Sequence, residues 1–363
     1  MSNKLKAGVI GLGMGWNHMA GYFTHPDVEV VAVADRREDR RQRFIREHGE
    51  KNIKFYNEGM DLIKNEKLDI ISVAVPNCQH KELTIAALES GANVLCEKPM
   101  AMKTAEAEEM LATAKKCGKK LGINFSYRFA PQSRAMKKVV DSGAMGEIYF
   151  GESTWFRRDG IPGLAASDFG TTSNAGGGMG SWFFDKKQSG GGPLIDLGVH
   201  RLDLALWLMG YPEPAWVLGS TYAKFGPERA KARGLEFTVE DLACALIKFK
   251  NGASLELKVS WAGNTKEREL QSTRLIGTKC GLLHKNINES YAYEVEFFKT
   301  ENGNHMDCQL HEPAPPAPSA YYLFADAVRN NTDFLVQPEE GVTVMRLLDA
   351  IYESAATGKP VEM

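Results

Sequence analysis

Short apolar segments alternate with helix-like segments over the first third of the chain. These apolar runs lie at residues 7–10, 28–34, 69–75, 93–96 and 121–125. Parallel strands that are covered by helices on both faces have this composition. Parallel neighbours also need long crossover connections, which are almost always right-handed. The alternation therefore predicts an α/β doubly wound parallel sheet over residues 1–124.

A glycine-rich turn, G-L-G-M-G-W, follows the first of these strands and precedes a helix. Such a turn lets the backbone approach a pyrophosphate at the N-terminus of the helix. The match to G-x-G-x-x-G is incomplete, because Trp16 stands where the third glycine is expected. The residues predicted to bind a dinucleotide here are Gly11, Gly13, Met14 and Gly15.

The second strand ends in Asp35, 22 residues after Gly13. An acidic residue at this place is suited to the ribose hydroxyls of the adenosine half, which favours NAD. Arg36 and Arg37 follow at once, and an arginine here can stack on adenine or bind a 2′-phosphate. NADP therefore stays open, and Arg36 is included among the predicted cofactor residues. The alternative is that these arginines begin a charged, solvated helix.

Two further strands end in polar residues at the same predicted rim of the sheet. Residues 92–100 read A-N-V-L-C-E-K-P-M, and residues 76–80 read P-N-C-Q-H. In open α/β sheets, ligands bind outside the carboxyl ends of the strands. Proline after Lys98 removes a backbone donor and disfavours helical geometry, so the lysine projects from a stiff turn. The cofactor contacts predicted here are Pro76, Asn77, His80, Glu97 and Lys98. The alternatives are a solvated Glu-Lys pair and, for His80, a cap at the start of a helix.

The alternation of short apolar strands with helices ends at about residue 125. Alternating runs at 241–250 and 253–261 flank Asn251-Gly252, a strong hairpin signal. Other strand-like runs lie at 148–156, 274–276 and 291–298. We predict an α+β second domain over residues 125–363, with a large and mostly antiparallel sheet.

An apolar helix after Pro193 carries Asp196, His200 and Asp203 on one face, at positions i, i+4 and i+7. Polar groups on a buried helix need partners. An aspartate one turn before a histidine can fix its tautomer and raise its basicity, as a general base requires. The commoner alternative is a satisfied Asp-His pair in the core. Three glycines at 190–192 favour a nearby ligand.

Aromatic and basic residues surround a glycine-rich segment at 159–192. Trp155, Arg157 and Trp182 are candidates for contacts with a sugar, with ordinary core packing as the favoured alternative for at least half of the residues in this group. His305, Cys308 and His311 are residue types that bind zinc. Their context favours a polar loop, so no metal is predicted.

Composition excludes several functions. The 363 residues carry a net charge of −2, which gives no footprint for nucleic acid or an anionic membrane. No window approaches 18 apolar residues, and the N-terminus has no cleavage site of a signal peptide. The six cysteines form no CxxC pair and are expected to be reduced. We expect a cytoplasmic protein.

Taken together, the motifs resemble the Gfo/Idh/MocA oxidoreductases over essentially the whole chain. The segments that carry the resemblance are G-L-G-M-G at 11–15, V-A-V-A-D at 31–35, P-N-C-Q-H at 76–80, E-K-P at 97–99, R-F-A-P at 128–131, the D-x-G-x-H-x-x-D block at 196–203 and S-A-A-T-G-K-P-V at 354–361. The resemblance implies a Rossmann domain and a second domain whose open sheet often forms a homodimer or homotetramer interface.

The resemblance also implies an activity, which is NAD(P)-dependent oxidation of a secondary hydroxyl of a sugar, sugar derivative or cyclitol, or the reverse reduction. Lys98 would contact the nicotinamide-side ribose and the reacting hydroxyl. His200 would act as general base, and Asp196 would orient it or contact the sugar. Arg128, from the family-like R-F-A-P segment, is a further substrate candidate. Two alternatives remain: a redox-neutral enzyme with tightly held NAD, and a non-catalytic sensor of sugar or nucleotide.

Overall fold

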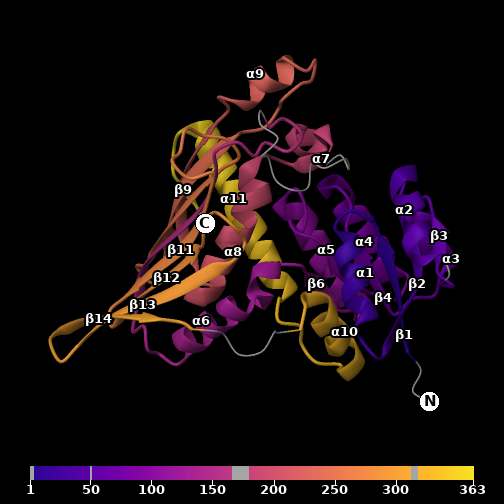
Figure 1. The fold of residues 1–363 in the computed structure, drawn as a ribbon, viewed down its shortest axis with the longest axis horizontal. Helices are drawn as coiled ribbons and strands as arrows, with labels where there is room; N and C mark the ends of the chain where they lie inside the picture. Colours follow the sequence, from indigo (N-terminus) through magenta and orange to yellow (C-terminus); the bar gives the residue numbers. More distant parts are fainter. Residues whose placement is uncertain (1–3, 50, 166–179, 312–317) are drawn as a thin grey trace. The chain divides into compact units, whose positions relative to one another are not determined.

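The computed structural model describes residues 4–49, 51–165, 180–311 and 318–363 (Figure 1). The chain forms two compact units. Unit one comprises Met1–Phe125 with Pro318–Met345, and unit two comprises Ser126–Ala317 with Arg346–Met363. The first break lies one residue after the predicted one. The structure differs from the predicted division at 318–345, which joins unit one and not the second domain.

Unit one contains a six-stranded sheet in the order β3-β2-β1-β4-β5-β6, and all its neighbouring strands are parallel (Figure 1). Its strands are β1 Leu5–Ile10, β2 Val28–Ala34, β3 Lys54–Tyr56, β4 Ile70–Val73, β5 Asn93–Cys96 and β6 Leu121–Ile123. The predicted doubly wound sheet is confirmed. The order reverses between β1 and β4, the kind of place where ligands bind in such sheets.

Helices accompany this sheet in the expected alternation. They are α1 Gly15–Phe23, α2 Glu38–His48, α3 Gly59–Asn65, the short 3-10 helix η1 Asn77–Gln79, α4 His80–Glu89, α5 Thr104–Cys117, α10 Ala320–Asn330 and the first part of α11 Pro338–Thr357. Helix α10 packs against α1. A Cβ on Gly21 of α1 would lie 2.6 Å from the Tyr321 ring. This close approach is one reason that 318–345 belongs to unit one.

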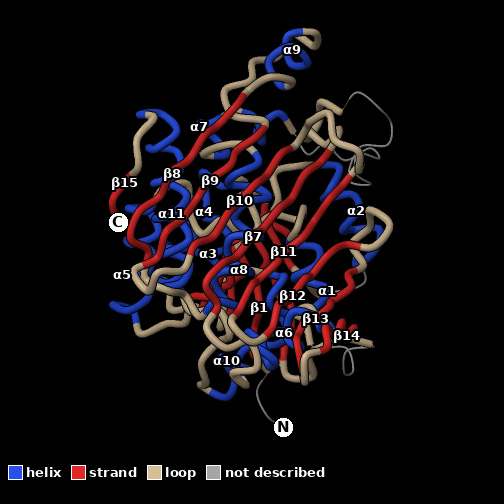
Figure 2. Tube along the Cα trace, turned by 90° about the vertical axis from the view of Figure 1, so that its left-hand side faces the viewer, coloured by secondary structure: helices blue, strands red, loops and turns tan. Residues whose placement is uncertain are grey.

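Unit two contains a nine-stranded sheet in the order β14-β13-β12-β11-β7-β10-β9-β8-β15 (Figure 2). Its strands are β7 Ile148–Arg157, β8 Pro214–Tyr222, β9 Leu242–Phe249, β10 Ser254–Ser260, β11 Glu269–Gly277, β12 Cys280–Asn286, β13 Tyr293–Glu301, β14 Asn304–Gln309 and β15 Val361–Glu362. Strands β7 and β10 run parallel, and the other neighbours run antiparallel. The predicted mostly antiparallel sheet is confirmed.

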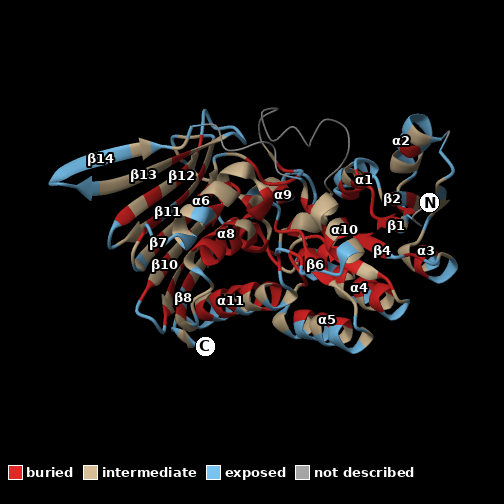
Figure 3. Cartoon of the chain, turned by 90° about the horizontal axis from the view of Figure 1, so that it is seen from below, coloured by how far each residue is buried: buried red, intermediate tan, exposed pale blue. Residues whose placement is uncertain are grey.

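The helices of unit two include α6 and α8, which pack on one face of this sheet. The segments are η2 Ser126–Phe129, α6 Pro131–Asp141, η4 Ser181–Phe184, α7 Lys186–Ser189, η5 Leu194–Gly198, α8 Val199–Met209, α9 Gly226–Lys231 and the end of α11. Helix α8 is buried along nearly its whole length (Figure 3). Among the described helices, none combines the length and apolar composition needed to cross a membrane.

The predicted apolar helix after Pro193 is not a uniform α-helix. Its first turn, η5, is a π-helix, and regular α-helix begins at Val199. Single π-helical turns often occur at functional sites because they change which residues share a face. Asp196 therefore lies in the π-helical turn, and His200 lies in the regular α-helix that follows it.

A buried ion pair joins η2 to α8. The Arg128 Nη2 donates to Asp203 Oδ1 at 2.6 Å, and both side chains are fully buried. The Tyr211 hydroxyl bonds both partners. The prediction that Arg128 contacts a substrate is not supported, because its guanidinium lies inside the unit. Asp203 likewise serves the core.

Replacing Arg128 with Met should lower the free energy of unfolding by about 3–5 kcal/mol, because it leaves the Asp203 carboxylate buried without its cation. Urea unfolding followed by tryptophan fluorescence measures the loss. Arg274→Met is the control, since Arg274 is half-exposed and lies 3.9 Å from Glu152. It should change stability by about 1 kcal/mol or less. Equal losses in the two variants would contradict the assigned role of Arg128.

Candidate active site

The glycine-rich turn lies between the end of β1 and the start of α1, at the carboxyl rim of the sheet (Figure 1). Gly11 has φ +89°, and a Cβ there would lie 2.2 Å from the Ala74 carbonyl oxygen. Only glycine fits this position. Gly13 and Met14 are exposed, and Met14 as N-cap gives α1 no capping bond from its side chain. The first N–H groups of α1 are thus suited to bind the phosphates of a dinucleotide.

Trp16, the departure from the glycine motif, does not lie over the turn. Its ring packs toward α2, with the Arg43 guanidinium 4.0 Å from its centroid and the His48 ring at 5.5 Å. Gly15 takes the position of close helix–strand contact instead, since a Cβ on it would lie 2.8 Å from Val9. The residues present therefore fit a bound dinucleotide.

Asp35 closes the other side of the turn. Its carboxylate accepts hydrogen bonds from the Leu12 N–H at 2.6 Å, the Arg37 N–H at 2.8 Å and Arg40 Nη1 at 2.9 Å. Asp35 is thus held against the glycine-rich turn, as its predicted role requires. Arg40 is a site residue that sequence reasoning missed. Arg40 follows Asp35 by five residues and lies in the first turn of α2. This spacing is the feature of the sequence that could have indicated a contact between the two side chains.

The two arginines singled out in the sequence are bound to other carboxylates. Arg36 pairs with Glu58 at 2.8 Å, and Arg37 pairs with Asp39 at 2.6 Å. Both ion pairs lie at the surface. Pro76 is the N-cap of η1 and Asn77 is its first residue, shortly after β4 ends at Val73. They lie beside the turn, because the Ala74 carbonyl and the Val75 side chain face Gly11.

Lys98 emerges from a buried segment. Every residue from Val94 to Ala101 is buried except Lys98, and the Lys98–Pro99 peptide bond is cis. Beneath it, the Glu97 carboxylate accepts hydrogen bonds from His18 Nε2 at 2.8 Å and Asn124 Nδ2 at 2.6 Å. Burial alone would raise the pKa of Glu97, but these bonds leave it below its ordinary value.

His80 supports the same turn from the other side. Its ring nitrogens lie 2.7 Å from the Pro99 carbonyl oxygen and 2.9 Å from that of Val75, and the side chain is fully buried. Burial lowers the pKa of His80. Glu97 and His80 were predicted to contact the cofactor. The structure places both beneath the surface, where they can hold the Lys98 turn in position.

Asp196 and His200 also emerge from a buried segment. From Gly191 to Leu208, they are the two residues that are not buried. The Asp196 carboxylate accepts a hydrogen bond from Trp261 Nε1 at 3.0 Å. The His200 ring lies 5.2 Å from the Tyr127 ring and 5.9 Å from the Trp155 ring, centroid to centroid. An imidazole and a carboxylate thus remain partly exposed on an otherwise buried helical segment.

Arg157 and Trp155 share one carboxylate partner, Glu269. Its Oε1 accepts from Trp155 Nε1 at 2.7 Å and from Arg157 Nε at 3.2 Å. Burial opposes the charge of Arg157, but Tyr291, Glu269 and Asp196 hold its pKa above the ordinary value. The predicted residues Trp155, Arg157, Asp196 and His200 are therefore brought together in unit two.

Behind these residues lies a second buried cation, Arg201. Its guanidinium lies 4.5 Å from the Tyr127 ring centroid and 5.1 Å from that of Trp155, and its Nη2 donates to Gln271 at 2.5 Å. It can hold in place the two rings that contact His200. Arg201, Gln271, Glu269 and Trp261 were missed, because nothing near them in the sequence marks them as partners.

Trp182 lies in η4, and its ring packs on Phe183 at 3.9 Å between centroids. Its predicted contact with a sugar stays a prediction. Much of the glycine-rich segment that precedes it, residues 166–179, lies outside the described residues.

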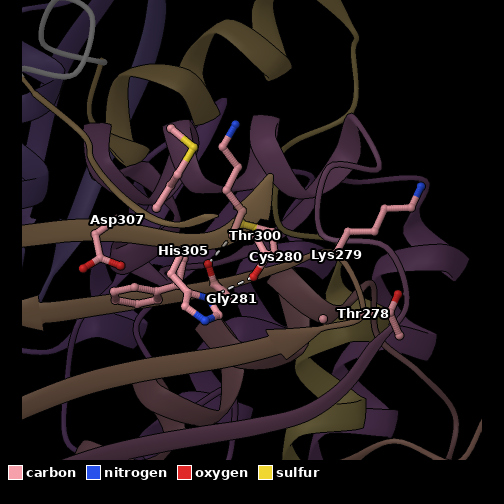
Figure 4. A pocket seen from close by; sticks show the side chains of 11 residues that line it. Thr278, Lys279, Cys280, Gly281, Thr300, His305 and Asp307 are labelled. Carbon is pink, nitrogen blue, oxygen red and sulfur yellow. Dashed lines mark hydrogen bonds between the residues drawn. The ribbon is translucent and has the colours of Figure 1, made fainter. Parts of the chain in front are cut away.

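A hollow of about 760 Å³ lies elsewhere in unit two, along β12, β13 and β14 (Figure 4). His305 and Asp307 line it, and none of the predicted site residues does. His305 and Cys308 are three positions apart on β14, so their side chains lie on opposite faces of the strand. In the described ranges, no group of three or more His, Cys, Asp or Glu side chains could hold a metal ion.

Glu97→Gln should reduce stability at neutral pH by about 1.5–3 kcal/mol, the range for hydrogen bonds to a charged group. The folded pKa of Glu97 is lowered, so its contribution is present above the unfolded pKa of about 4.3 and is lost as pH falls through the folded value. The difference between wild type and variant should therefore shrink below about pH 4. Urea unfolding across pH measures it.

Glu47→Gln is the matched control in the same unit, because Glu47 forms an exposed pair with Arg43. It should change stability by about 1 kcal/mol or less at each pH. A Glu97→Gln effect that is independent of pH would mean that the carboxylate charge contributes nothing.

Comparison with known proteins agrees with this geometry. Residues 5–125 match the model of the GFO_IDH_MocA oxidoreductase family with NAD-binding Rossmann fold, and residues 133–283 match a C-terminal domain of the same family. The chain is 31% identical over 371 residues to D-glucoside 3-dehydrogenase of Escherichia coli, covering 100% of this chain and 98% of that protein.

Two further proteins are similar over nearly the full length. Glucose-6-phosphate 3-dehydrogenase of Bacillus subtilis is 24% identical, with 99% of this chain and 98% of that protein covered. The structure of levoglucosan dehydrogenase in complex with NADH and levoglucosan has a TM-score of 0.83 at 21% identity, covering 99% of each chain. The matches to both domains and to the full-length relative agree with the motifs from Gly11 to Val361. This chain therefore belongs to the Gfo/Idh/MocA family of oxidoreductases, with an NAD-binding Rossmann domain.

Proposed function

We propose that this protein is an NAD-dependent dehydrogenase that oxidises a secondary hydroxyl of a sugar, sugar derivative or cyclitol, or reduces the matching ketone. The observation that carries the proposal is the selective exposure of Lys98, Asp196 and His200 from segments that are otherwise buried. Within this class, the full-length similarity to D-glucoside 3-dehydrogenase favours the C3 hydroxyl of a glucoside.

The cofactor would be held in unit one. Gly11, Gly13 and the N-terminus of α1 would bind the pyrophosphate, and Asp35 the adenosine ribose. Pro76, Asn77 and Lys98 lie at the same rim and would contact the nicotinamide half. Bound NAD supplies an acceptor for the hydride that leaves the hydroxyl-bearing carbon.

The proton of the same hydroxyl would go to His200. The imidazole is accessible and packs between aromatic rings, so it can reach a ligand without being fully solvated. Asp196, fixed by Trp261, would orient the sugar or the imidazole. Lys98 would bind the reacting hydroxyl, where its positive charge stabilises the developing alkoxide. Arg157 would form the wall that contacts the sugar ring, and Trp155, which is 3% exposed, would support it from beneath.

The test begins with binding. We expect NAD and NADH to raise the melting temperature of the protein, since a ligand that binds the folded state stabilises it. Turnover is then followed by the absorbance of the reduced nicotinamide, with methyl glucosides, glucose 6-phosphate, levoglucosan and myo-inositol as substrates. Copurified nucleotide with turnover in the absence of added cofactor would favour the redox-neutral alternative. Tight binding of a ligand without turnover would favour a sensor.

Lys98→Ala and His200→Ala should each lower kcat/KM by about 10²–10⁴, the usual contribution of a general acid or base. His305→Ala is the control, because His305 is an exposed histidine on β14 in the hollow away from these residues. It should leave turnover unchanged. Full turnover in both site variants would overturn the assigned roles. Light scattering would show whether the protein forms the expected homodimer or homotetramer.

A further inference from the structure

The helical segment that carries Asp196 begins against a buried carboxylate from a distant part of the chain. Glu240 lies in the loop before β9 and is 7% exposed. Its Oε2 accepts a hydrogen bond from the Gly192 N–H, and its Oε1 accepts one from the Leu194 N–H, both at 3.0 Å. Pro193 between them has no N–H. One carboxylate therefore binds the N–H groups on either side of this proline.

Gly192 connects this carboxylate to Asp196. Its N–H binds Glu240, and its carbonyl oxygen accepts a hydrogen bond from the Asp196 N–H at 3.1 Å. A Cβ on Gly192 would overlap the backbone carbonyl of Glu240, so only glycine allows the two segments to lie this close. Tyr352 of α11 also donates to Glu240, at 2.9 Å from Oε1. The backbone of Asp196 is thus tied to Glu240 through one residue.

The side chain of Asp196 is tied to the neighbouring residue, Asp241. Trp261 Nε1 donates to the Asp196 carboxylate at 3.0 Å, and the Trp261 N–H donates to the Asp241 carbonyl oxygen at 2.9 Å. Trp261 is fully buried. The Asp241 carboxylate accepts from the backbone N–H groups of residues 224–226 at 2.6–2.8 Å. The Glu240-Asp241 dipeptide thus reaches both the backbone and the carboxylate of Asp196.

A carboxylate from another element is an unusual way to satisfy the first N–H groups of a helix. Pro193, at the N-cap of η5, makes no capping bond from its side chain. A local Ser, Thr, Asp or Asn is the common cap, and it joins the helix to no other element. Burial raises the pKa of Glu240, although the hydrogen bonds from its donors oppose that rise. What this costlier arrangement adds is a fixed position of η5 against the loop before β9.

We propose that Glu240 is a positioning residue of the active site, which holds Asp196 where it can orient a sugar or the His200 imidazole. Asp241 and Trp261 provide the second route to the same side chain. The inference rests on the proposed function, because Asp196 acts on a substrate only if the protein is a sugar dehydrogenase. Glu240 is buried, so its effect on a substrate should pass through Asp196.

The indole N–H of Trp261 reports on this arrangement without turnover. A nitrogen–proton NMR correlation spectrum of the full chain gives one indole signal for each of the six tryptophans, and Trp261→Phe identifies the signal of Trp261. Asp196→Ala should move this signal upfield, because the indole N–H loses its acceptor. Glu240→Gln should move it in the same direction, since the amide nitrogen would face one of the two backbone N–H groups and release it.

Tyr352→Phe guards against a folding defect in the glutamine variant. It removes one donor and keeps the carboxylate, so it should move the Trp261 signal in the same direction by a smaller amount. Tyr211→Phe is the matched control, because it removes a buried hydroxyl from the Arg128–Asp203 pair in the same unit. It should leave the signal in place. An unchanged signal in both Glu240→Gln and Tyr352→Phe would overturn the proposal, as would an equal movement in the control.

A double-mutant cycle tests the effect on turnover. Glu240→Gln should lower kcat/KM by roughly 10- to 100-fold, as expected when a group of the site is misplaced by about 1 Å. In the Asp196→Ala background the same change should cost less than about threefold, because the two residues act through one position. Equal losses in both backgrounds would assign Glu240 a general structural role and overturn the proposal.

The failure of the proposed function gives a different result. Wild type would then show neither turnover nor binding of NAD, with no nucleotide released on denaturation. The Trp261 signal would still decide whether Glu240 positions Asp196, since that readout needs no substrate.

Discussion

The buried carboxylate of Glu97 is the constraint on which the arrangement of unit one depends. Removing a carboxylate from water costs several kcal/mol, and only well-placed donors offset that cost. The donors here come from α1, through His18, and from the end of β6, through Asn124. Because α1 also carries the N–H groups beside the glycine-rich turn, one charge sets the position of the phosphate-binding helix relative to the Lys98 turn. The Tyr321 ring of α10 packs against the His18 ring, with 4.2 Å between the centroids and a tilt of 42°, and extends the same network to the C-terminal segment.

In unit two, buried cations rather than a buried carboxylate fix the positions of the neighbouring elements. Arg128 fixes α8 to η2 through Asp203, and Arg201 holds the rings of Tyr127 and Trp155. In both units the buried ionic or polar network lies beneath the candidate reactive residues Lys98, Asp196 and His200, which are partly exposed. A group that must act on a substrate needs a fixed position and access, and this separation provides both. It also explains why so many polar residues in the motifs are buried.

Much of the fold was predictable, since apolar runs and their alternation reflect burial directly. Strand β3 was not, because Lys54–Tyr56 is too short to show a period. The site was predictable where spacing carries the chemistry, as for Gly11 and Asp35. Arg128 shows the limit: a single sequence displays a guanidinium but not its partner, and Asp203 lies 75 positions away. The same holds for Glu97 with His18 and for Asp196 with Trp261. The pairing of 318–345 with unit one also depends on contacts between distant segments.

The charges around His200 bear on the kind of sugar that suits this protein. Arg157 belongs to the proposed sugar wall, but it shares Glu269 with Trp155 and lies in the field of Asp196. A phosphorylated sugar would have to compete with these carboxylates for the guanidinium, and would meet their repulsion as well. The other nearby cation, Arg201, is fully buried behind aromatic rings. Under the proposed function, a neutral glycoside would need neither cation, because its hydroxyls could donate to Asp196 and Glu269. Under the proposed function, the balance of charge in unit two would therefore favour an uncharged glucoside over a sugar phosphate.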